Sequence, residues 1–153
     1  MTVPGSRAAG EVVVVRPRRA LIASVVGAVV VVALFTVIAV LLRTSPTGVY
    51  FRLADQVSMI VLGLLLAGGL LLMARPRVRA DADGIEVRNV AGSRRLPWSQ
   101  VRRIAFPDGA SWARLELPDD EYLPVLAIQA ADRDHAVAGI TRLRELHAAA
   151  KAS

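Results

Sequence analysis

Two long uncharged runs constrain this chain more than any other feature of its sequence. The first, residues 20–42, holds 23 consecutive residues without a charge, and the second, residues 56–74, holds 19. Helices over these runs would be about 35 and 28 Å long, which matches the hydrocarbon core of a bilayer. Because an unpaired strand leaves its backbone groups unsatisfied in lipid, we expect two transmembrane helices, at 20–42 and 56–74, that form one hairpin over residues 20–74.

The distribution of basic residues predicts the orientation of this hairpin. Residues 1–79 carry nine arginines against two acidic residues, whereas residues 80–153 carry ten basic residues against eleven acidic ones. Excess positive charge beside membrane spans favours the cytoplasmic side. We therefore expect a basic tail over residues 1–19, disordered through residue 15, and both termini in the cytoplasm at the inner membrane of a bacterial cell. The candidate membrane-flanking residues are Arg16, Arg18, Arg19, Arg75, Arg77 and Arg79.

Composition excludes several other classes of protein. A pI near 11.1 suggests polyanion binding, but the excess charge lies beside the apolar runs, so we expect a membrane and not a nucleic acid as partner. The chain has no cysteine, which excludes disulfides, a thiolate nucleophile and iron–sulfur clusters. A cleaved secretory signal is the alternative for the first run, but this run is longer than the usual apolar segment of about 7–15 residues.

Small residues inside the two runs predict how the helices pack. Ala23 and Gly27 in the first run, and Gly63 and Ala67 in the second, have a spacing that lets two helix backbones approach closely. Gly68 extends the second set. Neither run contains an ionisable residue, which a transport pathway normally requires. We therefore interpret the hairpin as an anchor.

The sequence from residue 75 to about 150 predicts a small α+β domain. Short alternating segments are separated by turn residues such as Asp83-Gly84, as in antiparallel sheets. Six strands are expected: one that ends near Ala82, and residues 85–89, 94–97, 101–106, 111–117 and 122–129. After Asp132, a candidate N-cap, the spacing becomes helical. The expected apolar stripe of this helix is Val137, Ile140, Leu143 and Leu146.

Several motifs of this domain together resemble a known family. They are D-G-I-E-V-R at 83–88, G-S-R-R-L-P-W-S-Q-V at 92–101, Phe106, S-W-A-R-L at 111–115 and L-P-V at 123–125. The set is similar to the small bacterial PH (pleckstrin-homology-like) domain of membrane proteins such as low molecular weight protein antigen 6. The resemblance implies a transmembrane α-helical hairpin followed by an α+β PH-like partial β-barrel with a C-terminal helix, at the cytoplasmic face of the inner membrane and without enzymatic activity.

One turn departs from the PH domains that bind phosphoinositides. Those domains carry a basic cluster in their first hairpin loop, whereas this chain has Asp81-Ala82-Asp83-Gly84. Two carboxylates would repel phosphate groups, so we do not expect inositol phosphates to bind by that route. We interpret the segment as a plain β-turn, because the further ligands of a calcium loop are absent.

The sequence contains few side chains that commonly take part in catalysis. His135 and His147, the two histidines, point about 120° apart on the C-terminal helix and cannot share a proton or a metal. We expect one to be solvated and the other to lie at the helix edge. The run Asp119-Asp120-Glu121 is expected at a solvated hairpin tip. The sequence thus predicts no catalytic residue, no cofactor and no metal site, and a protein that is not an enzyme.

Surface recognition is the function that remains. Trp98 is expected in the core, whereas Trp112 shares a strand face with Arg114, and such aromatic–arginine pairs are enriched at interfaces. Trp112 could equally cover the open end of the barrel or contact the membrane interface. The candidate interaction surface is Trp112, Arg114, Arg94, Arg95, Arg102 and Arg103.

We expect this surface to dock a protein partner or anionic lipid headgroups. The alternative is an accessory subunit that stabilises a larger envelope or transport complex through its transmembrane helices. The sequence leaves the oligomeric state open.

Overall fold

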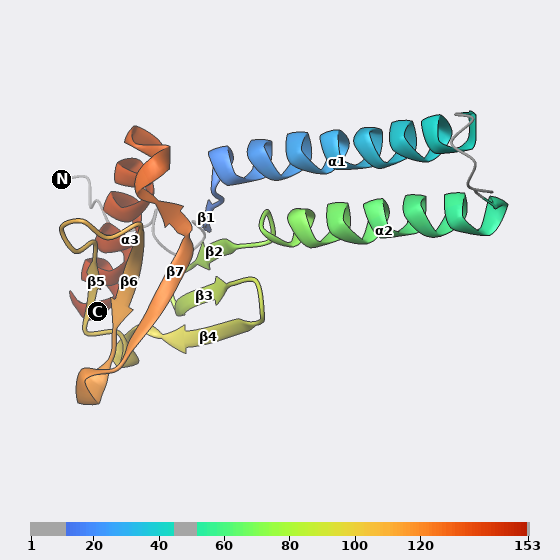
Figure 1. The fold of residues 1–153 in the computed structure, drawn as a ribbon. Coiled ribbons are helices and arrows are strands. Elements are labelled where there is room, and N and C mark those ends of the chain that lie inside the picture. Colours follow the sequence, from blue (N-terminus) through green and yellow to red (C-terminus); the bar gives the residue numbers. More distant parts are fainter. Residues whose placement is uncertain (1–11, 45–51, 153) are drawn as a thin grey trace. The chain divides into compact units, whose positions relative to one another are not determined.

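The computed structural model describes residues 12–44 and 52–152 of the chain. They belong to two compact units. One unit is helical and lies within residues 20–74. The other joins the residues up to Arg19 with those from Arg75 onward. The expected class is confirmed: two long apolar helices are followed by antiparallel sheets and a C-terminal helix (Figure 1).

Both apolar runs form helices. Helix α1 spans Arg18–Thr44 and α2 spans Leu53–Leu72, and both are long and apolar enough to cross a membrane. α2 begins three residues before the expected start at Gln56, because the Asp55 side chain accepts a hydrogen bond of 2.9 Å from the backbone N–H of Arg52 and caps the first turn. The connection at residues 45–51 lies outside the described residues.

Small residues bring the two helices together. Gly63 and Ala67 are the buried residues of α2. A Cβ atom at Gly63 would lie 2.7 Å from the Cβ of Phe35, so only glycine fits opposite that ring. A Cβ at Gly27 would lie 3.5 Å from the side chain of Leu70, which is ordinary contact.

The structure differs from the expected packing at two positions. Ala23 is exposed, and the buried residues of α1 are Ser24, Ala28 and Ala39. Gly68 is exposed as well, and a Cβ there would meet nothing within 4 Å. The buried face of α1 thus lies one residue from the predicted one, because Ser24 and Ala28 are buried next to Ala23 and Gly27.

The second unit contains two antiparallel sheets and one helix (Figure 1). The four-stranded sheet has the order β1 (Val13–Val15), β2 (Arg77–Ala80), β3 (Gly84–Arg88) and β4 (Ser93–Pro97). The three-stranded sheet has the order β5 (Arg103–Ala105), β6 (Trp112–Glu116) and β7 (Tyr122–Gln129). A 3-10 turn at Trp98–Gln100 connects the sheets, and α3 (Asp134–Ala152) closes the unit.

Strand β1 was not expected. Val13 and Val15 are buried and pair with Ala80 and Val78 of β2, whereas Val14 is exposed. The expectation of disorder through residue 15 was therefore wrong for this segment, while residues 1–11 lie outside the described part of the chain. Since β1 precedes α1 and β2 follows α2, the two long helices are inserted between neighbouring strands of one sheet.

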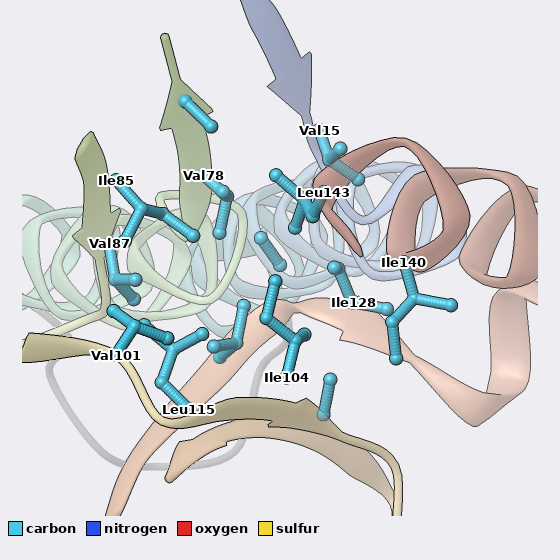
Figure 2. Packing of buried hydrophobic residues seen from close by; sticks show 14 of the residues in the cluster. Val15, Val78, Ile85, Val87, Val101, Ile104, Leu115, Ile128, Ile140 and Leu143 are labelled. Atoms are coloured by element: carbon cyan, nitrogen blue, oxygen red, sulfur yellow. The ribbon is translucent and has the colours of Figure 1, made fainter. Parts of the chain in front are cut away.

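The core lies between the inner faces of the two sheets and α3. Figure 2 shows Val78, Ile85 and Val87 from one sheet facing Leu115 from the other, and all four are almost fully buried. Leu143 of α3 is also fully buried. β1 reaches this core because α3 carries Gly139, where a Cβ would lie only 3.1 Å from a methyl group of Val15.

The buried face of α3 differs from the predicted stripe. Val137 is 63% exposed, whereas Ile140 and Leu143 are buried and Leu146 is partly buried. Steps of three residues drift around a helix, so Val137 and Leu146, nine residues apart, point in opposite directions at 100° per residue. The buried face consists of Ala136, Gly139, Ile140, Leu143 and His147.

Candidate functional site

Trp112 and Arg114 lie on the outer face of strand β6, but they have different surroundings. Alternation buries Ala113 and Leu115 and turns Trp112 and Arg114 outward, as expected. Trp112 is 45% exposed. A register shift between Trp112 and Ala113 displaces the tryptophan from the regular ladder. Arg114 is half-buried and lies over the ring of Tyr122, with its Cζ 5.5 Å from the ring centre. Trp112 is thus the freely exposed member of the pair.

Glu116 neutralises two of the predicted arginines. Arg103 donates two hydrogen bonds of 3.0 Å to the Glu116 carboxylate, and Arg114 donates one of 3.2 Å. The hydrogen bond from Arg103 is the main cause that lowers the pKa of Glu116, and the same bond raises the pKa of Arg103. Arg114 and Glu116 line a hollow of about 290 Å³ together with Arg102, Asp120 and Glu121, so the hollow carries charges of both signs.

The other predicted arginines fall into two groups. Arg95 forms an ion pair of 3.0 Å with Asp81. Arg94 and Arg102 are exposed, and neither has an ion pair within the described residues. Of the membrane-flanking set, Arg77 and Arg79 lie on β2, Arg16 follows β1, Arg18 and Arg19 begin α1, and Arg75 precedes β2.

In the acidic turn between β2 and β3, the Asp81 carboxylate accepts hydrogen bonds from the backbone of the turn itself. The Oδ1 atom of Asp81 accepts bonds from the backbone N–H groups of Asp83 and Gly84, at 3.1 and 3.0 Å. The carbonyl of Asp81 accepts a bond of 2.8 Å from the indole N–H of Trp98, which is buried as expected. Gly84 is required because a Cβ there would collide with the carbonyl oxygen of Leu96. The segment is a structural turn.

The side chains of α3 cover the outer edge of β5. His147 contacts the carbonyl oxygen of Val101 at 2.8 Å, and Arg144 donates a bond of 3.1 Å to that of Ile104. Lys151 donates to the carbonyl of Arg102. An uncovered edge strand is a template for adding another strand, and the bond from Arg144 engages a carbonyl of β5 itself, while His147 and Lys151 engage the two residues before it. His147 was expected at the helix edge but is buried against Trp98, with ring centres 5.3 Å apart.

A groove beside α3 is lined mainly by apolar side chains, and the sequence did not predict it. It has a volume of about 400 Å³. Its lining includes Phe106, Ala136, Val137 and Ile140, with Arg133 and Arg144 as basic members. Ala130 also lines it, one residue beyond Gln129, which pairs with Trp112. The groove is open because Val137 is exposed. The sequence pattern placed Val137 on the buried face of the helix, and for this reason it did not predict the groove. We call these residues the α3 groove.

Two polar contacts join Arg16 and Arg19, near the start of α1, to the segment around the start of α3. Asp132 is 8% exposed and its Oδ1 accepts a hydrogen bond of 2.9 Å from the backbone N–H of Arg19. His135 contacts the carbonyl oxygen of Arg16 at 3.1 Å. Asp132 was expected to cap the C-terminal helix, but α3 begins at Asp134 and the carboxylate serves the first turn of α1 instead.

The titratable side chains do not converge. Among residues 12–44 and 52–152, no three His, Asp or Glu side chains are close enough together to hold a metal ion. His135 and His147 contact different backbone carbonyls. The absence of enzymatic activity stays a prediction.

Comparisons with known proteins agree with this architecture. Residues 75–146 match the family described as bacterial PH domain. The uncharacterized protein Rv1417 of Mycobacterium tuberculosis is 53% identical over 106 residues, which cover 69% of this chain and 69% of that protein. The uncharacterized protein Mb1452 of Mycobacterium bovis matches to the same extent.

A more distant relative is the protein that the sequence motifs resemble. Low molecular weight protein antigen 6 of Mycobacterium tuberculosis is 38% identical over 61 residues, which cover 40% of this chain and 54% of that protein. No solved structure matches the chain. The match over residues 75–146 and the extended similarity to Rv1417 show that this chain belongs to the bacterial PH domain family.

Proposed function

We propose that the chain is a membrane-anchored, non-catalytic PH-like module that docks a protein partner at the cytoplasmic face of the bacterial inner membrane. The α3 groove and Trp112 form the docking surface. The observation that carries this proposal is the insertion of both apolar helices between β1 and β2.

The insertion supports the anchoring and its topology. Only 11% of the most apolar 18-residue window of each long helix is buried within the structure, which is unlike the core helix of a soluble protein. β1 and β2 pair residue by residue, so the chain before α1 and the chain after α2 must lie on the same side of a membrane. The arginines at both outer flanks favour the cytoplasmic side.

The α3 groove supports a protein partner. An exposed apolar hollow between a helix and a sheet end suits one or two apolar side chains, and Arg133 and Arg144 would attract a neighbouring carboxylate. Trp112 provides an exposed aromatic surface near Ala130 of the same groove. The partner segment we expect therefore combines apolar and acidic residues.

Site-specific photocrosslinking in cells tests the docking surface. A photoreactive residue at Val137 should yield a discrete crosslinked product, whereas one at Arg142, exposed on the same helix but outside the groove, should not. The product from Val137 should be lost when Trp112→Ala is introduced. Equal products from both positions, or a product indifferent to Trp112→Ala, would contradict the assignment of this surface.

Cysteine accessibility tests the topology. The chain has no cysteine, so Ser93→Cys introduces a single exposed thiol on β4. In intact spheroplasts an impermeant maleimide should leave this thiol unmodified, and permeabilisation should make it reactive. Labelling from outside would contradict a cytoplasmic domain, and recovery of the intact protein in the soluble fraction would contradict the anchor.

A second candidate function is favoured by the exposed small residues of the helices. Ala23 is exposed, and Cβ atoms at Gly68 and Gly69 would meet nothing within 4 Å. Such positions permit close packing with helices of another protein, as in an accessory subunit of an envelope or transport complex. Replacing both helices by polyleucine spans, with residues 12–19 and 75–153 kept, separates the two functions. Crosslinking from Val137 should persist if the domain docks the partner and fail if the helices do.

A further inference from the structure

The outer face of the four-stranded sheet carries a row of arginines on β2, on β3 and directly after β1. Arg77 of β2 pairs directly with Arg88 of β3. Arg16 follows Val15, the last paired residue of β1, and the register continued by one position past Val15–Val78 sets Arg16 opposite Arg77. Alternation turns all three side chains away from the core, because Val15, Val78 and Val87 point into it. We call Arg16, Arg77 and Arg88 the arginine row.

The arginine row has no carboxylate partner among the described residues. The ion pairs of that part of the chain involve Arg95, Arg103 and Arg114 only. Arg77 and Arg88 are half-buried, and directly opposed cross-strand residues have Cα atoms about 5 Å apart. Like charges in this position destabilise a sheet, and partial burial weakens the screening by water.

The neighbouring row on the same face has the opposite character. In that row Arg79 lies opposite Glu86 on the neighbouring strand, and Glu86 lies opposite Arg95. Arg95 also forms an ion pair with Asp81. Charges alternate along this second row. The sheet therefore balances its charges in one row and leaves three positive charges together in the other, which indicates that the arginine row is complemented by an anion from outside the chain.

The position of the row in the chain indicates the source of that anion. Arg16 lies two residues before the start of α1, and Arg77 lies five residues after the end of α2. At about 3.3 Å per residue, Arg77 is at most about 17 Å from the end of α2. If both helices cross a bilayer, the row lies within reach of the phosphate layer.

We propose that the arginine row binds the phosphate of an anionic phospholipid headgroup. This inference rests on the membrane anchoring in the proposed function, but not on the protein partner. A phosphate oxygen between Arg77 and Arg88 converts their repulsion into charge-assisted hydrogen bonds. Arg16 adds a third donor group from the segment between β1 and α1. The site differs from the acidic Asp81–Gly84 turn, where the carboxylate is already engaged.

A dye on the edge strand tests the proposal in the full-length protein. Ser93 is exposed and pairs with Arg88, so Ser93→Cys places a single labelling position at the end of the row. The labelled protein is reconstituted in nanodiscs of phosphatidylcholine with increasing phosphatidylglycerol and a constant fraction of a lipid with a nitroxide on its headgroup. Quenching of the dye should rise with phosphatidylglycerol in the wild-type background.

The double variant Arg77→Gln/Arg88→Gln should abolish this rise. At roughly 1 kcal/mol for each basic residue near an anionic surface, two substitutions weaken the local association about thirty-fold. The control is Arg95→Gln, which removes one positive charge from the same sheet face, from a residue already paired with Asp81; the single variant Arg77→Gln is matched to it in charge. The control should quench as the wild type does, and tryptophan fluorescence verifies that each variant is folded.

Three outcomes would overturn the proposal. The first is quenching that does not depend on phosphatidylglycerol, and the second is an equal loss in the double variant and in Arg95→Gln. The third is displacement by inorganic phosphate beyond that by chloride of equal ionic strength, which would assign the row to a soluble anion. Accessibility of the thiol on Ser93→Cys and crosslinking from Val137 do not depend on the row, so the proposed function would stand or fall separately.

Discussion

Truncation of Val15 tests whether the strand before the first helix belongs to the core of the PH-like domain. Val15 is 4% exposed and packs against Gly139 of α3. Val15→Ala removes two buried methyl groups, each worth about 0.8 kcal/mol in transfer free energy, and leaves a small cavity. The expected loss in the free energy of unfolding is therefore about 2 to 3 kcal/mol.

Val14→Ala is the matched control, because Val14 lies on the same strand but is 51% exposed. Both substitutions have the same effect on strand propensity, so the difference between them isolates burial. The control should cost less than about 1 kcal/mol.

Thermal unfolding of the detergent-solubilised protein, followed by Trp98 fluorescence, measures the difference. The chain has two tryptophans, and Trp112→Phe leaves Trp98 as the one reporter, buried beside His147. At about 4–8 °C per kcal/mol for a domain of this size, Val15→Ala should melt about 10 °C or more below the wild type. Equal and small shifts for Val14→Ala and Val15→Ala would refute the integration of β1 into the core.

Three further predictions concern single side chains of the same domain. The lowered pKa of Glu116 means that its contribution to stability is present above its ordinary pKa of 4.5 and is lost as the pH falls through the lower folded value, so in acid denaturation the wild type should lose more stability than Glu116→Gln. His147→Ala leaves the carbonyl of Val101 without its buried donor and should cost about 1 to 3 kcal/mol in urea unfolding, whereas an unchanged midpoint would contradict that role. Arg133 has φ 44° and ψ −115°, a conformation that favours glycine, so Arg133→Gly should raise the melting temperature by the equivalent of about 0.5 to 1 kcal/mol; a lower melting temperature would show that the side chain matters more than the strain.

Local patterns predicted most of the fold. The uncharged runs located both long helices, and alternation located six of the seven strands, since these patterns reflect only neighbouring residues. β1 could not be found in this way, because its partner β2 lies more than sixty residues further along the chain and three valines in a basic tail carry no turn signal beside them. Strand pairing over that distance is a tertiary event.

The candidate site was less predictable than the fold. Alternation placed Trp112 and Arg114 on the outer face of β6, but not the engagement of Arg114 with Glu116 and Tyr122. The stripe through Val137 followed a three-residue spacing that drifts around a helix, which concealed the α3 groove. Partners of charged side chains depend on register between strands, and the sequence alone does not give register.

The insertion of the helical pair between β1 and β2 makes the order of synthesis significant. β1 leaves the ribosome first and must remain without its partner until both apolar helices and the start of β2 have been made. In the proposed membrane topology, insertion of both helices brings the two strands to the same side of the bilayer, and the sheet is completed. If only one of the two helices crossed the bilayer, β1 and β2 would lie on opposite sides of it. The positions of Val13 and Val15 beside β2 would then stay unoccupied. Under the proposed anchoring, the domain can therefore be completed only after both helices have crossed the membrane.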